Sequence, residues 1–260
     1  MLEHLNRGWR VIATAIAFSV FGLGGLLLRL VAVPLLGGCR WWSREQRARI
    51  ARRGVHLSFR AFIELMRVLG ILTYEVHGRQ RLDRQGLLIL ANHPTLLDVV
   101  FLISLVPNAD CVVKGSLARN PFTRGALRLT DYICNDSGAG LVEDCIASLQ
   151  RGNNLIIFPE GTRTPVDGPM KLQRGAANIA VRGPNDITPV QIRCEPRSLT
   201  KGLPWWRVPP RPMHFTVAVQ PDLAVRAFLE AAGGEAIAAR ELTTYLHDYF
   251  SKDVSIHARA

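Results

Sequence analysis

Short apolar runs alternate with amphipathic stretches along most of the chain. Apolar runs bounded by turn residues predict strands at 74–78, 87–91, 111–113, 132–134, 155–158, 187–192 and 214–219. Apolar residues spaced by threes and fours predict helices at 94–106, 116–129, 140–151, 173–182, 222–232 and 234–250. Strands that alternate with helices are typical of a sheet covered on both faces. We therefore expect an α/β fold with a mixed, largely parallel sheet flanked by helices.

The N-terminal part follows a different pattern. Residues 11–28 carry no charge, and after Arg29 an apolar stretch continues over 30–36. An 18-residue helix rises about 27 Å, close to the ~30 Å hydrocarbon core of a bilayer. Residues 43–72 then have the spacing of one basic amphipathic helix. We interpret 1–72 as an N-terminal membrane-anchoring helical region, because no cleavage site of a signal peptide is evident, and 73–260 as a separate α/β domain.

Charge supports a membrane-associated protein. The chain has 32 Lys and Arg against 21 Asp and Glu, a net charge of +11, although arginine richness can also reflect the base composition of a genome. The flank behind the apolar stretch is basic and predicts the cytoplasmic face of a bacterial inner membrane; its arginines are Arg40, Arg44, Arg47, Arg49, Arg52 and Arg53. Arg7 and Arg10 weaken this asymmetry, so a spanning helix and a shallow hairpin both stay open.

A Pro-rich loop at 202–215 repeats the membrane signal. It contains Trp205 and Trp206 beside Arg207, a composition found at bilayer interfaces, although packing of the loop onto the domain is the alternative. The basic residues border apolar and Trp-rich segments, and no nucleic-acid-binding fold is visible, so nucleic acid is not expected as a partner.

Polar side chains interrupt the apolar stretch "GLLILANHPTLLDVVFL", residues 86–102. The strand at 87–91 ends at Asn92 and His93, and Pro94 fits the first turn of a following helix. At this junction Asp98 can accept a hydrogen bond from one ring nitrogen of His93. That bond fixes the tautomer and leaves the other nitrogen free as a base. A structural His–Asp cap is the alternative, since this spacing alone is weak evidence.

A second strand ends in a similar way, in "NNLIIFPEGTRT", residues 153–164. Here Glu160 and Arg163 supply a carboxylate and a planar cation suited to an anionic group, and Gly161 permits close approach of backbone. Sites in parallel sheets form beyond the carboxyl ends of strands, so we expect this turn and His93 to meet at one edge. Together they predict a general base facing an anion site.

At this point the sequence resembles a known family, the glycerolipid acyltransferases of the 1-acyl-sn-glycerol-3-phosphate type. The matching motifs are "NHPTLLD" at 92–98, "KGSLARNPF" at 114–122, "FPEGTR" at 158–163 and "ITPVQI" at 187–192. Their order and spacing resemble the family over roughly residues 75–220. The resemblance implies an O-acyltransferase in phospholipid biosynthesis, with acyl-CoA or acyl carrier protein as donor and a hydroxyl of a lysophospholipid or related lipid as acceptor.

The resemblance also implies roles for single residues. His93 deprotonates the acceptor hydroxyl, Asp98 orients His93, and no acyl-enzyme forms. Substrate binding falls to Lys114, Glu160, Gly161, Thr162 and Arg163. In one place the sequence departs from the family: Asn135–Asp136 stands where an acidic residue followed by Arg helps to bind the acceptor phosphate. This change puts lysophosphatidate in doubt as the acceptor, because a carboxylate repels phosphate.

Other chemistry finds less support in the sequence. The five cysteines show no metal-ligand spacing, so neither a metal nor a cofactor is expected, and reduced thiols are the simplest reading. Cys134 is a weak candidate for a nucleophile. Two other functions stay open: a catalytically silent lipid-binding or tethering protein, and a thioester or ester hydrolase.

Overall fold

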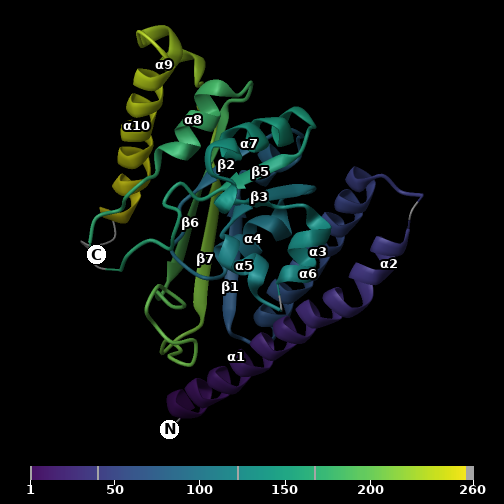
Figure 1. Ribbon diagram of the computed structural model, residues 1–260. Helices are drawn as coiled ribbons and strands as arrows, with labels where there is room; N and C mark the ends of the chain where they lie inside the picture. Colours follow the sequence, from purple (N-terminus) through teal and green to yellow (C-terminus); the bar gives the residue numbers. More distant parts are fainter. Residues whose placement is uncertain (1, 40, 122, 167, 256–260) are drawn as a thin grey trace.

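The computed structural model describes residues 2–39, 41–121, 123–166 and 168–255 (Figure 1). The helices are α1 (Leu2–Leu27), α2 (Val33–Gly38), α3 (Arg44–Val68), α4 (Asp98–Leu105), α5 (Gly115–Arg119), α6 (Arg124–Thr130), α7 (Leu141–Gln150), α8 (Arg174–Arg182), α9 (Arg226–Ala231) and α10 (Glu235–Ser255). A π-helical turn, Leu28–Ala32, joins α1 to α2.

The strands form one seven-stranded sheet in the order β1-β7-β6-β2-β5-β3-β4. They are β1 (Leu72–His77), β2 (Leu88–Ala91), β3 (Ala109–Val113), β4 (Ile133–Cys134), β5 (Asn154–Ile157), β6 (Ile187–Glu195) and β7 (Met213–Val219). Only the β6–β7 pair is antiparallel. The expected mixed, largely parallel sheet is therefore confirmed, and each predicted strand overlaps an observed one.

Helices cover both faces of the sheet, and strand β2 shows why (Figure 1). Ile89 and Ala91 point into a core cluster shared with α1, α3 and α4. Leu88 and Leu90 point into the opposite cluster, shared with α7, α8 and α10. A strand buried on both faces must be apolar at every position, which accounts for the uninterrupted run in the sequence.

The apolar N-terminal helix lies against the domain. Ala13 and Ala17 are fully buried, and Phe21 packs on Phe62 of α3 with ring centroids 5.0 Å apart. Because α1 and α3 share a core cluster with β2, both sides of residue 72 belong to one packed unit. The division into an anchoring region and a catalytic domain at this residue stays a prediction.

The outer side of this helix is apolar and exposed. Within the described residues, Asn6–Gly38 is the one helical stretch whose length and composition suit a membrane crossing, and only 17% of its most apolar window is buried. The exposed apolar side chains are Trp9, Ile12, Ile16, Val20, Leu23, Leu27, Leu30, Val31 and Leu35.

Two arginines, Arg10 and Arg29, bind the apolar N-terminal stretch to the domain near its two ends. An Nη2–H of Arg10 donates to the carbonyl oxygens of Pro209, at 3.2 Å, and Pro210. Nη1 of Arg29 donates to the carbonyl oxygen of Pro121 at 3.2 Å. The two arginines are 19 positions apart, which is about 28 Å along a helix. This stretch therefore lies along the domain surface and does not extend away from it.

The basic flank divides into exposed and buried arginines. Arg44 is exposed and pairs with Asp131 at 2.6 Å. Arg52 belongs to the basic flank that was expected at the membrane surface, but it is 5% exposed and forms a buried ion pair with Asp110 at 2.9 Å. That expectation is wrong because position 52 lies on the face of α3 that packs against the sheet. Arg40 lies outside the described residues.

Candidate functional site

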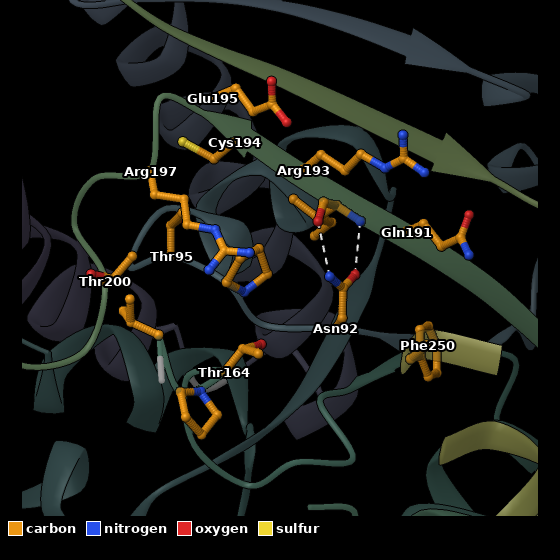
Figure 2. A pocket seen from close by; sticks show the side chains of 14 residues that line it. Asn92, Thr95, Thr164, Gln191, Arg193, Cys194, Glu195, Arg197, Thr200 and Phe250 are labelled. Atoms are coloured by element: carbon orange, nitrogen blue, oxygen red, sulfur yellow. Dashed lines mark hydrogen bonds between the residues drawn. The ribbon is translucent and has the colours of Figure 1, made fainter. Parts of the chain in front are cut away.

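Strand β2 ends at Ala91, where Asn92 changes the direction of the chain. The Asn92 side chain donates from Nδ2 to the carbonyl oxygen of Ile192 at 2.9 Å, and its Oδ1 accepts the N–H of Ile192 at 2.8 Å. Figure 2 shows both bonds as dashed lines. The side-chain amide thus takes the place of a backbone pair with β6, and the main chain is free to leave the sheet at His93.

His93 and Asp98 form the predicted hydrogen bond. Nδ1 of His93 lies 2.8 Å from Oδ2 of Asp98. Asp98 also accepts the backbone N–H of Thr95 at 2.6 Å and the Thr95 hydroxyl at 2.6 Å. Its side chain is fully buried, whereas that of His93 is 15% exposed. Burial raises the pKa of Asp98, and the hydrogen bonds from His93 and Thr95 oppose that rise.

The helix that carries Asp98 begins later than expected. We predicted a helix from residue 94 with Pro94 in its first turn, but α4 begins at Asp98 and residues 92–97 form a loop. The Asp98 carboxylate holds this loop through Thr95 and His93, so three of its contacts lie N-terminal to the helix. Thr95 is a contact that the sequence analysis missed, since the helix predicted at 94–106 places this residue in a regular helical turn.

The turn after β5 meets the His93 loop, as predicted. The Phe158 ring stacks on the His93 imidazole with centroids 4.3 Å apart. Oε1 of Glu160 accepts the backbone N–H of His93 at 2.9 Å and the Thr164 hydroxyl at 2.7 Å. The N–H of Thr164 donates to the carbonyl oxygen of His93 at 2.7 Å. The main chain of His93 is therefore fixed on both sides of its side chain.

Glu160 is an internal residue. It is 4% exposed, and its Oε2 has no hydrogen-bond partner among the described residues. Burial raises the pKa of Glu160, against the effect of the hydrogen bonds from Thr164 and His93. This geometry supports a positioning role toward His93 more directly than a contact with substrate, which was the sequence expectation.

The remaining residues of this turn differ in their surroundings. Gly161 is exposed and has φ +65°, a conformation that suits glycine, and Thr162 is partly exposed. Nη1 of Arg163 donates to the carbonyl oxygens of Leu199 and Thr200, both at 3.0 Å. Arg163 was expected to meet an anion, but part of its guanidinium already binds the segment after β6.

Lys114 lies at the same edge of the sheet, at the end of β3. It is exposed and directly precedes α5. Nearby, Oδ1 of Asn135 accepts the N–H of Gly115 at 3.2 Å, and Oδ2 of Asp136 lies 3.7 Å from Nη1 of Arg119. Because β2, β5, β3 and β4 run parallel, their carboxyl ends bring His93, the Glu160 turn and Lys114 to one edge. The Asp136 carboxylate offsets positive charge on the β4 side.

On the β6 side, a pocket of about 90 Å³ opens beside the His93 loop. Asn92, Pro94 and Thr95 from that loop line it, together with the strand β6 and the segment after it. Figure 2 shows the Arg197 side chain extending over the pocket, whereas the Glu195 carboxylate lies at the rim and points away from that guanidinium. The residues of the wall are Thr164, Pro165, Val166, Gln191, Ile192, Arg193, Cys194, Glu195, Arg197, Thr200 and Phe250.

The sequence analysis did not find this pocket. Its two arginines, Arg193 and Arg197, follow the motif at 187–192, and the β2–β6 pairing brings the end of β6 next to the His93 loop. The alternation of apolar and polar residues from Val190 to Cys194 could have indicated which face of the strand carries Arg193, but not that the chain after the strand turns toward residues 92–95.

Metal and thiol chemistry find no geometric support in the described residues. No group of three or more His, Cys, Asp or Glu side chains among them could hold a metal ion. All five cysteines are free thiols, and burial raises the pKa of Cys111, Cys145 and Cys194 to about 12. A thiol with a raised pKa is a poor nucleophile.

The chain is similar to known acyltransferases. Residues 73–193 match the family model described as Acyltransferase. A 1-acyl-sn-glycerol-3-phosphate acyltransferase of Pseudomonas aeruginosa is 31% identical over 134 residues, which are 49% of this chain and 52% of the relative. One of Saccharomyces cerevisiae is 27% identical over 147 residues, 52% of this chain and 48% of the relative. The chain thus spans about half the length of the curated relatives it matches.

A solved structure agrees with the fold over nearly the whole chain. The crystal structure of the 1-acyl-sn-glycerophosphate (LPA) acyltransferase from Thermotoga maritima superposes with a TM-score of 0.69, covering 97% of this chain and 96% of that chain, at 21% identity. At that identity the likeness concerns the fold alone. The part of the chain that matches the acyltransferase family model, residues 73–193, holds His93, Asp98 and the Glu160 turn.

Proposed function

We propose that this protein is an O-acyltransferase that moves a fatty acyl group from a thioester to a hydroxyl of a lysophospholipid or related lipid. The observation that carries the proposal is the His93–Asp98 pair, whose 2.8 Å hydrogen bond leaves the second ring nitrogen available at a partly exposed position. The names of the similar proteins support the same class of reaction. Neither a metal nor a cofactor enters the proposed reaction.

In the proposed step, Nε2 of His93 takes the proton of the acceptor hydroxyl while the oxygen attacks the thioester carbonyl. The tetrahedral intermediate collapses, the carbon–sulfur bond breaks, and the leaving thiolate takes the proton from the imidazolium. The new ester and a free thiol are the products, so atoms and charge balance. Asp98 keeps the proton on Nδ1 and stabilises the imidazolium, which is the role of a carboxylate in such pairs.

The donor and the acceptor both carry phosphate in the substrates that we propose, acyl-CoA or acyl carrier protein and a lysophospholipid. Exposed cations lie on both sides of His93: Lys114 at the end of β3 and Arg197 over the pocket beside β6. We assign the Arg197 pocket to a phosphate-bearing part of one substrate, because the Asp136 carboxylate opposes an anion on the β4 side. Gly161 and Thr162 lie between these cations in the sheet order and offer backbone to either substrate.

We further propose that the protein sits on the cytoplasmic face of a bacterial inner membrane. The exposed apolar side of α1 enters the interface, and Trp206 and Arg207 extend the same contact. Arg10 and Arg29 both bind carbonyls of the domain, which favours a helix lying on the bilayer over one crossing it. The net charge of +11 suits anionic lipids and an acidic carrier protein as donor.

The test is an assay of the purified protein in vesicles with labelled acyl thioesters and a panel of lipid acceptors. We expect an acylated lipid whose formation depends on acceptor, and a loss of about 10²–10⁴-fold in kcat for His93→Ala. His77→Ala, at an exposed position on β1, is the matched control. Free fatty acid released independently of acceptor indicates a hydrolase. Lipid binding without any product indicates a silent binding protein, and both results contradict the proposal.

A further inference from the structure

The segment that joins β6 to β7, residues 196–212, contacts both the apolar helix and the loop that carries His93. We call it the connecting segment. At one end, the carbonyl oxygen of Leu199 accepts the backbone N–H of Leu96 at 3.1 Å. Leu96 lies between His93 and Asp98, so this bond holds the middle of the loop that presents the imidazole.

The same carbonyl is fixed in an unusual backbone conformation. Leu199 has φ +54°, in the left-handed region that bulky side chains rarely adopt, and its side chain is 5% exposed. Such a backbone conformation is strained and persists only when its surroundings hold it in place. Here Arg163 and Leu96 both donate to the Leu199 carbonyl, so the strained residue serves as their common acceptor.

At the other end, the connecting segment is held by α1. The Arg10 guanidinium donates to the carbonyl oxygens of Pro209 and Pro210, and the Phe18 ring lies 6.0 Å from that of Trp205. Arg10 is 2% exposed, on the face of α1 that also buries Ala13 and Thr14, and its Nε has no partner among the described residues. The Arg10 guanidinium donates only to the two backbone carbonyls and to the side-chain oxygen of Asn6. Burying a cation with such partners, rather than with a carboxylate, costs free energy.

We propose that Arg10 is a positioning residue for the His93–Asp98 site, which it reaches through the connecting segment. Seating of α1 fixes Pro209 and Pro210, and the segment then presents the Leu199 carbonyl to Leu96. The loop geometry at His93 therefore depends on how the lipid-facing helix sits on the domain. The kinetic part of this inference rests on the proposed acyl transfer, whereas its structural part does not.

The test compares Arg10→Met with Arg7→Met, which removes the same charge from an exposed position three residues earlier on the same helix. Met keeps most of the buried apolar volume of Arg10, whereas the carbonyls of Pro209 and Pro210 lose their donor, so Arg10→Met tests these hydrogen bonds. Hydrogen exchange of the full chain in vesicles is read at the Leu96 amide. We expect exchange at least tenfold faster in Arg10→Met and unchanged in Arg7→Met.

Kinetics supply the second measurement. We expect kcat to fall about tenfold in Arg10→Met with KM for both substrates within twofold, equal vesicle binding, and partial recovery in Arg10→Lys. Unchanged exchange at Leu96 overturns the inference whatever the activity, and an unchanged kcat beside faster exchange overturns the positioning role. If no variant or wild-type protein transfers acyl groups, the exchange result still decides the structural link. If Arg10→Met does not fold, Phe18→Leu takes its place in both measurements, because it weakens the contact between α1 and Trp205.

Discussion

Oδ2 of Asp98 accepts two hydrogen bonds at once, from Nδ1 of His93 at 2.8 Å and from the backbone N–H of Thr95 at 2.6 Å. One buried oxygen therefore sets both the orientation of the imidazole and the shape of the loop that carries it. Any change at Asp98 acts on the ring and on the loop together.

We predict that Asp98→Asn lowers kcat by about 10²–10⁴-fold, because the amide can present an N–H to Nδ1 and favour the wrong tautomer. Steady-state kinetics with a fixed thioester donor measure the loss. Thr95→Val removes only the hydroxyl bond to Oδ1 and serves as the comparison; its loss is expected to be at least tenfold smaller. Equal losses in the two variants contradict the tautomer argument.

Glu160 makes the stability of the protein depend on pH. Its pKa is raised by burial above the ordinary value of 4.5, so the folded state holds a proton that the unfolded state releases. Stability is therefore expected to fall as pH rises from about 4.5 through the raised pKa, and to be unaffected by this group at lower pH. Glu160→Gln removes that decline while its carbonyl still accepts from His93.

Urea unfolding at a series of pH values measures this difference between wild type and Glu160→Gln. The control is Glu143→Gln at the exposed start of α7, where a backbone N–H and Arg182 lower the pKa of the carboxyl. Because the pKa of Glu143 is lowered, its contribution to the free energy of unfolding is expected to rise with pH, opposite to that of Glu160. A difference between Glu160→Gln and wild type that stays constant with pH argues against a raised pKa at Glu160.

Kinetics can distinguish the roles of Arg197 and Lys114, the exposed cations on the two sides of His93, in substrate binding. We predict that Arg197→Gln raises KM for one phosphate-bearing substrate about tenfold, the effect of losing roughly 1.5 kcal/mol from a hydrogen bond to a charged group. Lys114→Gln is expected to act on the other substrate. Arg151→Gln, with the same charge change beyond the C-terminus of α7, provides the control. If Arg197→Gln leaves KM for both donor and acceptor unchanged, the pocket does not bind phosphate.

Membrane binding is expected to depend on the outer face of α1. Leu23 and Leu27 are 62% and 61% exposed and lie one turn apart. Replacing both by Asn is predicted to weaken binding to anionic vesicles by at least tenfold, since each buried leucine contributes about 1.5–3 kcal/mol. Vesicle flotation measures the loss, with Ile237→Asn on α10 as the control. Equal flotation of the two proteins contradicts membrane contact through α1.

The sequence predicted the sheet because its central strands are buried on both faces and read as uninterrupted apolar runs. It also predicted the His93–Asp98 bond, since both residues lie in one short segment. The loop between them was mistaken for helix because Pro94 is compatible with a first helical turn. The roles of Arg10, Arg52 and Arg163 could not be read locally, since each binds residues at least 36 positions away along the chain.

The two hydrogen bonds of Asn92 to Ile192 determine where the His93 imidazole lies. The side-chain amide of Asn92 has a donor and an acceptor at nearly the spacing of a peptide group. It can therefore make the last pair of hydrogen bonds to β6 after the main chain has left the sheet. Alanine at position 92 leaves the N–H and the carbonyl of Ile192 without these two partners. Aspartate lacks the N–H that donates to the Ile192 carbonyl. The Asn92 amide thereby fixes where the main chain leaves β6, and so the point from which His93 and the pocket-lining residues Pro94 and Thr95 start.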